Sequence, residues 1–340
     1  MPRVNCVGIA IPPKYPQEEV FKKLGYRGLF WPLFKSTGIA AKPLCVPVEK
    51  LLESTAQDMH DNYFKFSLSL SEASIADCLH KANLRPEEID CLIYVSCTGM
   101  VCPTPTYWLV DKMGFRKDAK HIPIVGTGCQ GSLPAMEVAH NYCKVNPKSK
   151  VLVVSCEISN AAYFPDNRTD TNLAMANAIF GDGSTTMLVT NVGPGLEMID
   201  FETIVENEYI NDIKLPWESA RLKIVLSGKI PYVTSQMAKQ VAETLLSRNN
   251  LNKEDVAHYI VHSGGSRILD QVEKLLGLPQ RSMKYSWDTW EEVGNLSSVT
   301  ICIALDKLLE SKKLRAGDKV IVVSLGAGLQ CIGCLTEWRE

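Results

Sequence analysis

The chain has 340 residues, of which 22% are charged and 46% are hydrophobic, and these are ordinary values for a globular protein. Its 36 Lys and Arg residues against 38 Asp and Glu residues give a formal net charge of −2, which argues against a nucleic-acid binder driven by positive charge. At about 150 residues per domain, the length predicts two units that each bury a core.

The N-terminal segment does not have the pattern of an export signal. Residues 1–13 hold a single basic residue, Arg3, and prolines interrupt their apolar stretch, unlike a signal peptide. The longest uncharged stretch, residues 91–110, contains Gly99, Pro103 and Pro105 and does not predict a membrane helix. We therefore expect a cytoplasmic protein without a membrane partner.

Helix and strand patterns alternate along the chain. In the first part, apolar spacing predicts a helix, two strands, a helix and a strand, at residues 71–82, 91–97, 121–125, 135–145 and 151–155. The second part shows a helix, a strand, a helix and a strand, at residues 233–247, 260–261, 301–309 and 319–324. Residues 13–55 and 193–231 lack clear periodicity, and we interpret them as irregular insertions that form pocket walls.

The two parts of the chain resemble each other, which indicates a duplication. Residues 84–95 resemble residues 251–262, and residues 150–155 resemble residues 319–324, at nearly the same offset along the chain. The strands are too apolar for one-sided exposure, which favours parallel strands covered by helices on both faces. The sequence therefore predicts an α/β protein of two related halves, residues 1–200 and residues 201–340.

Twelve cysteines are spread along the chain, several of them within apolar runs. Their share is well below the ~8–10% typical of disulfide scaffolds, so we interpret them as reduced thiols. A zinc site is the alternative, with Cys97 and Cys102, or Cys331 and Cys334, as paired ligands. The second pair has C-x-x-C spacing but lies in an apolar stretch without another pair or a nearby His. We therefore predict buried strand cysteines and no metal.

A glycine-rich turn places Cys129 at the start of a helix. Residues 126–131 follow a predicted strand, and a thiol at a helix N-terminus is expected to have a lowered pKa. The same residues match G-x-G-x-x-G, and Glu157 closes the next strand, so a dinucleotide site is an alternative. The cysteine would crowd a pyrophosphate, and the second half repeats no glycine signature. The pattern therefore favours a nucleophile.

Two further residues are expected to lie near Cys129. His262 follows an apolar strand and should lie at its carboxyl end, where open α/β sheets bind ligands. Asn295 lies in residues 294–298, the duplicated counterpart of the cysteine turn. Cys, His and Asn also occur in this order in papain-like proteases, but those carry C-G-[SA]-C-[WY] near the mature N-terminus, which this chain lacks.

These residues lie in motifs that resemble the thiolase superfamily and, within it, the type III polyketide synthases. The motifs run in order as Gly128-Cys129, residues 151–158, residues 178–183, residues 262–271, residues 294–298 and residues 325–329. The resemblance implies a thiolase-like fold, in which two duplicated α/β halves form a five-layered αβαβα core.

The resemblance also implies an activity. In a homodimer, Cys129 would be acylated by a starter acyl-CoA, and malonyl-CoA would be decarboxylated to an enolate that attacks the thioester. His262 and Asn295 would donate hydrogen bonds to the developing enolate. The backbone of Cys129 and the loop Gly326 to Gly328 would form a second oxyanion hole. CoA thioesters are the implied substrates, and no cofactor is implied.

Further residues match positions that line the pocket or bind CoA in this family. Phe180 matches a gatekeeper, and Ile224 aligns with a second gatekeeper that is usually aromatic. Cys97, Thr98, Ser159 and Ser297 match pocket-lining positions, and Lys42, Gly264 and Arg267 are candidates for binding CoA. The sequence Ser324-Leu-Gly-Ala-Gly is closer to ketoacyl synthase III, which makes a single condensation onto an acyl carrier protein. That reaction is the alternative, and an inactive scaffold is a third possibility.

Overall fold

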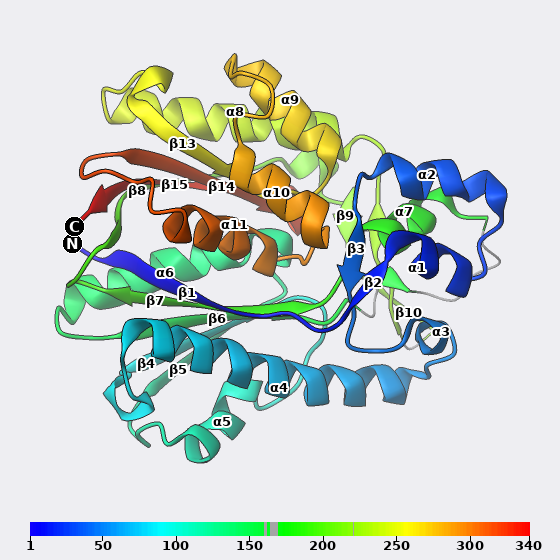
Figure 1. The fold of residues 1–340 in the computed structure, drawn as a ribbon, viewed down its shortest axis with the longest axis horizontal. Coiled ribbons are helices and arrows are strands. Elements are labelled where there is room, and N and C mark those ends of the chain that lie inside the picture. Colours follow the sequence, from blue (N-terminus) through cyan, green and yellow to red (C-terminus); the bar gives the residue numbers. More distant parts are fainter. Residues whose placement is uncertain (160–161, 164–168, 220) are drawn as a thin grey trace.

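Five layers of helix and sheet stack on one another in the computed structural model, which describes residues 1–159, 162–163, 169–219 and 221–340 (Figure 1). Two sheets alternate with three helical layers, and this arrangement confirms the predicted thiolase-like core. From the bottom of the view, the helices of these layers are α4 (Ala56–Ala82) and α5 (Pro105–Met113), then α6 (Ser132–Val145) and α11 (Val299–Glu310), then α8 (Ile230–Arg248) and α9 (Ser266–Leu276).

The strands of the two halves form one nine-stranded sheet with the order β13-β14-β15-β8-β1-β7-β6-β4-β5. The first half contributes β1 (Arg3–Ala10), β4 (Cys91–Ser96), β5 (Lys120–Val125), β6 (Val151–Glu157) and β7 (Gly183–Thr190). The second half contributes β8 (Gly195–Val205), β13 (Val256–Val261), β14 (Lys319–Gly326) and β15 (Gln330–Arg339). The two parts join only where Arg3 and Val4 pair with Glu197 and Leu196, so each half keeps a sheet of its own.

Burial on both faces explains the apolar strands. Every residue of β4, β6 and β7 is buried, because α4 covers one face of the first sheet while α6 and α11 cover the other. Strand β4 runs parallel to both β5 and β6, and β13 runs parallel to β14. These pairings confirm the parallel strands expected from the sequence.

The duplicated segments occupy equivalent places. Strands β13 and β14 repeat β4 and β6, and α11 repeats α6 in the central layer. Among the described residues, no strand of the second half corresponds to β5, and α10 (Lys284–Val293) precedes α11 instead. The predicted boundary at residue 200 falls inside β8.

Strand β8 corrects the prediction that residues 193–231 are irregular throughout. It spans 11 residues and pairs with β15 along its length. Its acidic residues obscured the strand pattern, but arginines neutralise them. Arg248 contacts Asp200 and Glu202 at 2.7 Å each, while Arg3 and Arg339 lie within 3.6 Å of Glu197.

Short elements form a cap at one end of the layers (right side of Figure 1). They come from the two stretches that lack periodicity and from the segment before β7. The helices are α1 (Gln17–Lys23), α2 (Trp31–Ser36), α3 (Val48–Leu51) and α7 (Thr171–Ile179). The strand pairs are β2 (Lys14–Pro16) with β3 (Ala41–Pro43), β9 (Ile213–Lys214) with β12 (Val225–Leu226), and β10 (Trp217–Glu218) with β11 (Arg221–Leu222).

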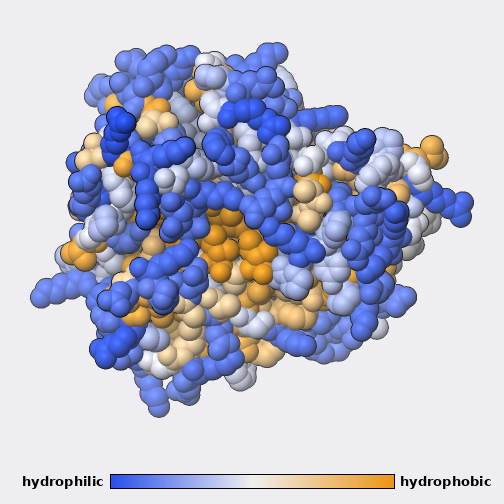
Figure 2. Space-filling view, in the orientation of Figure 1, coloured by the Kyte–Doolittle hydropathy of each residue, from blue (hydrophilic) through white to orange (hydrophobic). Residues whose placement is uncertain are grey.

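Apolar residues are concentrated inside the molecule. Figure 2 shows a largely hydrophilic surface with apolar side chains gathered near the middle of this face. All twelve cysteines are free thiols, and Cys331 and Cys334 lie buried on β15 as predicted. In the described part of the chain, no group of His, Cys, Asp and Glu could hold a metal ion, and no helix there has the length and apolarity to cross a membrane.

Gly8→Ala is expected to destabilise the fold, because β1 and α4 meet at this glycine. A Cβ atom on Gly8 would lie 2.2 Å from the Ser74 carbonyl oxygen and 2.3 Å from the Cys78 nitrogen, both backbone atoms of α4. The expected loss of unfolding free energy is about 1–3 kcal/mol, measured as a lower urea midpoint. Gly28→Ala is the control, since a Cβ there meets nothing within 4 Å. Equal midpoints for the two variants would contradict the close packing.

Candidate active site

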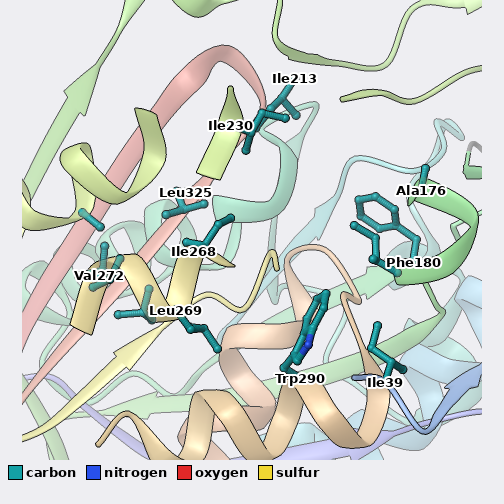
Figure 3. Packing of buried hydrophobic residues seen from close by; sticks show 14 of the residues in the cluster. Ile39, Ala176, Phe180, Ile213, Ile230, Ile268, Leu269, Val272, Trp290 and Leu325 are labelled. Carbon is teal, nitrogen blue, oxygen red and sulfur yellow. The ribbon is translucent and has the colours of Figure 1, made fainter. Parts of the chain in front are cut away.

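A cavity of about 350 Å³ lies where the cap meets the carboxyl ends of β4, β6, β13 and β14. Its wall is mostly apolar, and Figure 3 shows Phe180 at the right of the view, Ile213 and Ile230 near the top, Ile268 left of the centre and Trp290 below the centre. Most of the predicted site residues line this single cavity, namely Cys97, Thr98, Cys129, Ser159, Phe180, Ile224, His262, Gly264, Arg267, Asn295, Ser297 and Gly326. The structure therefore brings together residues from both halves of the chain.

Cys129 lies in a single helical turn, Gly128–Gln130, between β5 and α6. Gly128 has φ +75°, and a Cβ on it would lie 2.7 Å from the Ala327 nitrogen, so the turn requires glycine. The Ser324 hydroxyl donates to the Cys129 carbonyl at 3.3 Å. A Cβ on Gly326 would lie 2.7 Å from the Cys129 nitrogen. Bare backbone at Gly326 thus leaves room beside the Cys129 amide.

The protonation state of Cys129 differs from the sequence-based expectation. Burial raises the pKa of its thiol to about 11, although hydrogen bonds with Ser297 and Asn295 oppose this shift. The helix N-terminus was expected to lower the pKa, and that prediction is wrong for this cavity. An apolar pocket penalises the thiolate more than the nearby backbone amides stabilise it. Cys129 is therefore a neutral thiol at pH 7.

His262 follows the last residue of β13, at the carboxyl end of the strand as predicted. Its backbone amide donates to the Val323 carbonyl at 2.8 Å and so continues the pairing with β14. The side chain is buried, and its Nδ1 has no hydrogen-bond partner within the described chain. Burial lowers the pKa of His262 to about 4, so the imidazole is neutral and free to accept or donate one proton.

Asn295 is held in one orientation. Its Oδ1 accepts a hydrogen bond from the Ser297 amide at 2.8 Å, which fixes the side-chain oxygen and directs the NH₂ group elsewhere. The Asn295 side chain interacts with the Cys129 thiol and lowers its pKa. The backbone of Asn295 also pairs with the end of α7, because its amide donates to the Ile179 carbonyl at 2.9 Å. The NH₂ group is therefore a fixed donor beside Cys129.

Glu157 is a site residue whose role the sequence did not reveal. It is fully buried at the end of β6, and its Oε2 accepts from the Thr98 hydroxyl at 2.7 Å. Its Oε1 accepts from Ser297 at 3.2 Å and Ser298 at 2.6 Å. Because both carboxylate oxygens accept hydrogen bonds from inside the protein, Glu157 is not placed to bind a ribose, and the dinucleotide alternative is wrong on this point. The sequence signal that could have revealed this role is a carboxylate at the end of an apolar strand.

The pocket residues on either side of this carboxylate share its hydrogen bonds. The Cys97 amide donates to Glu157 at 3.0 Å, and the Cys97 thiol contacts the Ser297 hydroxyl at 3.2 Å. Ser159 donates its hydroxyl to the Gly181 carbonyl at 2.6 Å.

Gly328 has φ +75° in the turn after β14 and lies outside the cavity lining. Leu33, Met175 and Trp290 line the cavity without having been predicted.

Lys42 does not lie where a CoA phosphate could reach it. Its side chain is fully buried, and its Nζ donates to the Tyr163 hydroxyl at 2.9 Å and to the Asn177 carbonyl. The prediction that Lys42 binds CoA is therefore wrong, because the basic side chain points inward rather than to the cavity mouth. Arg267 is exposed at the edge of the cavity, and Gly264 lies beside it.

Alkylation of Cys129 is expected to depend steeply on pH. Since its pKa is about 11, the thiolate fraction rises about tenfold per pH unit, so labelling by iodoacetamide should be about 100-fold faster at pH 9 than at pH 7. Peptide mass spectrometry of the alkylated protein measures the rate at Cys129 alone. A rate that stays constant between pH 7 and pH 9 would instead indicate a thiolate paired with a charged His262.

Comparisons with known proteins agree with this geometry. Residues 32–198 match the family model described as FAE1/Type III polyketide synthase-like protein. Residues 246–338 match the model described as 3-Oxoacyl-[acyl-carrier-protein (ACP)] synthase III C terminal. The two models fall on the two halves of the chain, as expected for related α/β units.

Similar proteins span almost the whole chain. A 1,3,6,8-tetrahydroxynaphthalene synthase of Streptomyces coelicolor is 30% identical over 313 residues, covering 90% of this chain and 82% of that protein. A 3,5-dihydroxyphenylacetyl-CoA synthase of Streptomyces toyocaensis is 26% identical, covering 99% of this chain and 90% of the other. The crystal structure of the 1,3,6,8-tetrahydroxynaphthalene synthase from Streptomyces coelicolor A3(2), a bacterial type III polyketide synthase, superposes with a TM-score of 0.91 at 26% identity, covering 99% of both chains.

Proposed function

Because the chain belongs to the type III polyketide synthases, a family of acyltransferases, we propose that it extends a starter acyl-CoA by repeated decarboxylative condensation with malonyl-CoA. The observation that carries this proposal is the meeting of Cys129, His262 and Asn295 in one apolar cavity. These residues supply a nucleophile, a neutral imidazole and a fixed amide donor. The described relatives favour this iterative reaction over a single condensation of the ketoacyl synthase III type.

The first step loads the starter onto Cys129. The thiol loses its proton to the neutral imidazole of His262 as its sulfur attacks the thioester carbonyl. A new thioester bond forms to Cys129, the bond to CoA breaks, and the CoA thiolate leaves with the proton from His262. The Cys129 amide and the bare backbone at Gly326 accommodate the negative oxygen of the intermediate.

The second step generates the carbon nucleophile. The thioester carbonyl of malonyl-CoA accepts hydrogen bonds from His262 and from the Asn295 NH₂ group, which stabilise the enolate as carbon dioxide leaves. The apolar lining favours exclusion of water, which would protect the enolate from protonation. It attacks the Cys129 thioester, a carbon–carbon bond forms, and Cys129 is released as the leaving group. The extended chain is now a thioester of CoA, and Cys129 attacks its thioester carbonyl and releases CoA, so that the chain returns to Cys129 for the next condensation. Decarboxylation supplies the carbanion, so the cycle requires no cofactor and no metal.

Arg267 and Gly264 are the remaining candidates for binding CoA. Arg267 is exposed at the cavity edge, at the start of α9, where its guanidinium can pair with a phosphate. Gly264 lines the cavity beside Arg267, and a Cβ on it would lie 3.2 Å from Ile268 Cδ1 and 3.4 Å from the His262 ring. This arrangement supports entry of the pantetheine arm between α9 and the cap.

A homodimer is the proposed assembly, in the cytoplasm. Strand β5 ends the sheet order and, among the residues that the structure describes, pairs only with β4, which leaves an edge open to a second copy. Val125 on this edge is 46% exposed and Trp108 on α5 is 52% exposed, large values for apolar side chains. Two β5 edges related by a twofold axis would cover them. The twelve free thiols support a reducing compartment.

Incubation with CoA thioesters tests the proposed function. The protein is given malonyl-CoA alone, and then malonyl-CoA with a panel of aromatic and fatty acyl-CoA starters, and products are identified by mass spectrometry. Products that carry several malonyl-derived units are expected. Single-extension products that form only with an acyl carrier protein would move the enzyme to the ketoacyl synthase III reaction.

Ile224→Phe is expected to shift the products toward fewer extension units. Ile224 lines the cavity, and a larger ring there reduces the space for the growing chain. Product lengths by mass spectrometry measure the shift, while the rate of malonyl-CoA decarboxylation should change by less than about threefold, because Ile224 is not a donor to the enolate. Ile210→Phe makes a similar change at an exposed position outside the lining and should leave the products unchanged. Identical products from both variants would contradict the assigned role of Ile224.

A further inference from the structure

The end of helix α7 is held by an unusual set of hydrogen bonds. The last carbonyl groups of a helix have no partner within it and are commonly left to water. In α7 the final three helical carbonyls and the next one each accept a hydrogen bond from outside the helix. The pairs are Lys42 Nζ to Asn177 O, Gln17 Nε2 to Ala178 O at 2.7 Å, Asn295 N to Ile179 O at 2.9 Å, and Tyr163 Oη to Phe180 O at 2.9 Å.

This junction connects two residues of the active site. Phe180 directly follows α7 and pairs with Asn295 in a parallel bridge. The Gly181 amide donates to the Asn295 carbonyl at 3.1 Å, and the Asn295 amide donates to the Ile179 carbonyl. Each of the two segments therefore both donates to the other and accepts from it. Any displacement of the end of α7 therefore moves the Phe180 ring and the Asn295 backbone together.

Lys42 makes two of the contacts that fix this end. Its ammonium donates to the Asn177 carbonyl and to the Tyr163 hydroxyl. The Tyr163 hydroxyl in turn donates a hydrogen bond to the Phe180 carbonyl. A cation also favours the negative end of the helix dipole. Lys42 thus reaches the gatekeeper without touching the cavity, since it is absent from the lining.

A fully buried lysine is costly, and its surroundings compensate for only part of that cost. Burial lowers the pKa of Lys42 to about 7, and the Asp182 carboxylate opposes this shift. Asp182 is itself buried and accepts from the Ser159 and Cys45 amides at 2.7 Å each. An apolar residue would fill the space at lower cost but would leave the Asn177 carbonyl without this donor. We therefore explain the buried lysine by the position that it gives to the end of α7.

We propose that Lys42 is a positioning residue that sets the placement of Phe180 and Asn295 through the end of α7. The inference rests on the proposed function, since it assigns a consequence to two residues of that site. Lys42 does not touch the substrate. It keeps the amide donor of Asn295 and the gatekeeper Phe180 in fixed positions relative to each other.

Two variants and a matched control test this inference. Lys42→Met keeps the length of the side chain and removes its donor, and Tyr163→Phe removes only the hydroxyl that bridges Lys42 and Phe180. Tyr259→Phe is the control, because the Tyr259 hydroxyl also donates to a backbone carbonyl, that of Lys253 at 3.3 Å, away from α7 and from the cavity lining. Activity is expressed per Cys129 that iodoacetamide can label, so misfolded protein does not count.

Lys42→Met is expected to lower kcat for malonyl-CoA decarboxylation by about 10-fold to 100-fold and to broaden the product distribution, because displaced catalytic groups have effects of this size. Tyr163→Phe should change both quantities in the same direction, and the double variant should be no worse than Lys42→Met. Tyr259→Phe should match the unaltered protein. Unchanged kcat and products in Lys42→Met, with only a lower Tm, would overturn the inference.

Hydrogen exchange provides a readout that does not depend on the reaction. The Gly181 and Asn295 amides should exchange faster in Lys42→Met than in the unaltered protein, while peptides from β6 keep their protection. If the unaltered protein fails to decarboxylate malonyl-CoA, the proposed function fails, and this exchange result still decides whether Lys42 holds the junction. Equal exchange in both proteins would overturn the role of Lys42 even if the enzyme is active.

Discussion

Cys129→Ala is expected to abolish acyl loading and to reduce polyketide formation by a factor on the order of 10⁴ or more, as loss of a covalent nucleophile does in other enzymes. No other thiol is placed to replace it. Cys97 lines the same cavity, but its thiol is engaged with Ser297, and burial raises the pKa of Cys97 well above its usual range. Intact-protein mass spectrometry after mixing with an acyl-CoA measures loading directly.

Cys102→Ser is the matched control for this experiment. Cys102 is exposed and outside the cavity lining, so its removal should leave loading unchanged. The fold should tolerate Cys129→Ala, because the thiol faces the cavity rather than the core. A mass adduct that persists in Cys129→Ala would show that another residue carries the acyl group.

The second large effect is expected when the donors to the enolate are removed. Asn295→Asp keeps an oxygen that accepts from the Ser297 amide but removes the NH₂ donor and adds a negative charge beside the enolate. Loss of one such donor typically costs about 10²-fold to 10³-fold in rate. Malonyl-CoA decarboxylation, followed as release of carbon dioxide, should fall by at least this factor, while loading of Cys129 should fall far less.

His262→Gln separates the two roles of the imidazole. A glutamine side chain retains an N–H donor but cannot accept the thiol proton at neutral pH. Loading should therefore fall more than decarboxylation, the reverse of the pattern for Asn295→Asp. If both variants released carbon dioxide at the rate of the unaltered protein, neither residue would be a donor to the enolate.

The positions of the three central residues could be predicted because they follow from topology. Ligands of open α/β sheets bind at the carboxyl ends of the parallel strands, which is where Cys129 after β5 and His262 after β13 lie, and the relation between the two halves predicted that these ends meet. The duplication placed Asn295 opposite Cys129 for the same reason. Periodicity found α6, α8 and α11 and the last part of α4, but it did not find α5, α9 and α10.

Burial and its electrostatic effects could not be predicted from the sequence. Lys42 was expected to bind the CoA phosphates because the resemblance implies basic residues there, and only the structure shows that its side chain is fully buried. The pKa of Cys129 depends on how completely the cavity excludes water, which no local motif encodes. Strand β8 was missed because arginines from β1, α8 and β15 neutralise its acidic residues, and these partners are remote in sequence.

The central claim is that one chain grows on Cys129 by repeated condensation. The most direct measurement is a time course of the Cys129 peptide by mass spectrometry after rapid mixing with a starter acyl-CoA and malonyl-CoA. We predict a ladder of adducts on this peptide, each longer than the last by one malonyl-derived two-carbon unit, and no ladder in Asn295→Asp. A single acyl adduct that never lengthens while malonyl-CoA is consumed would contradict the account.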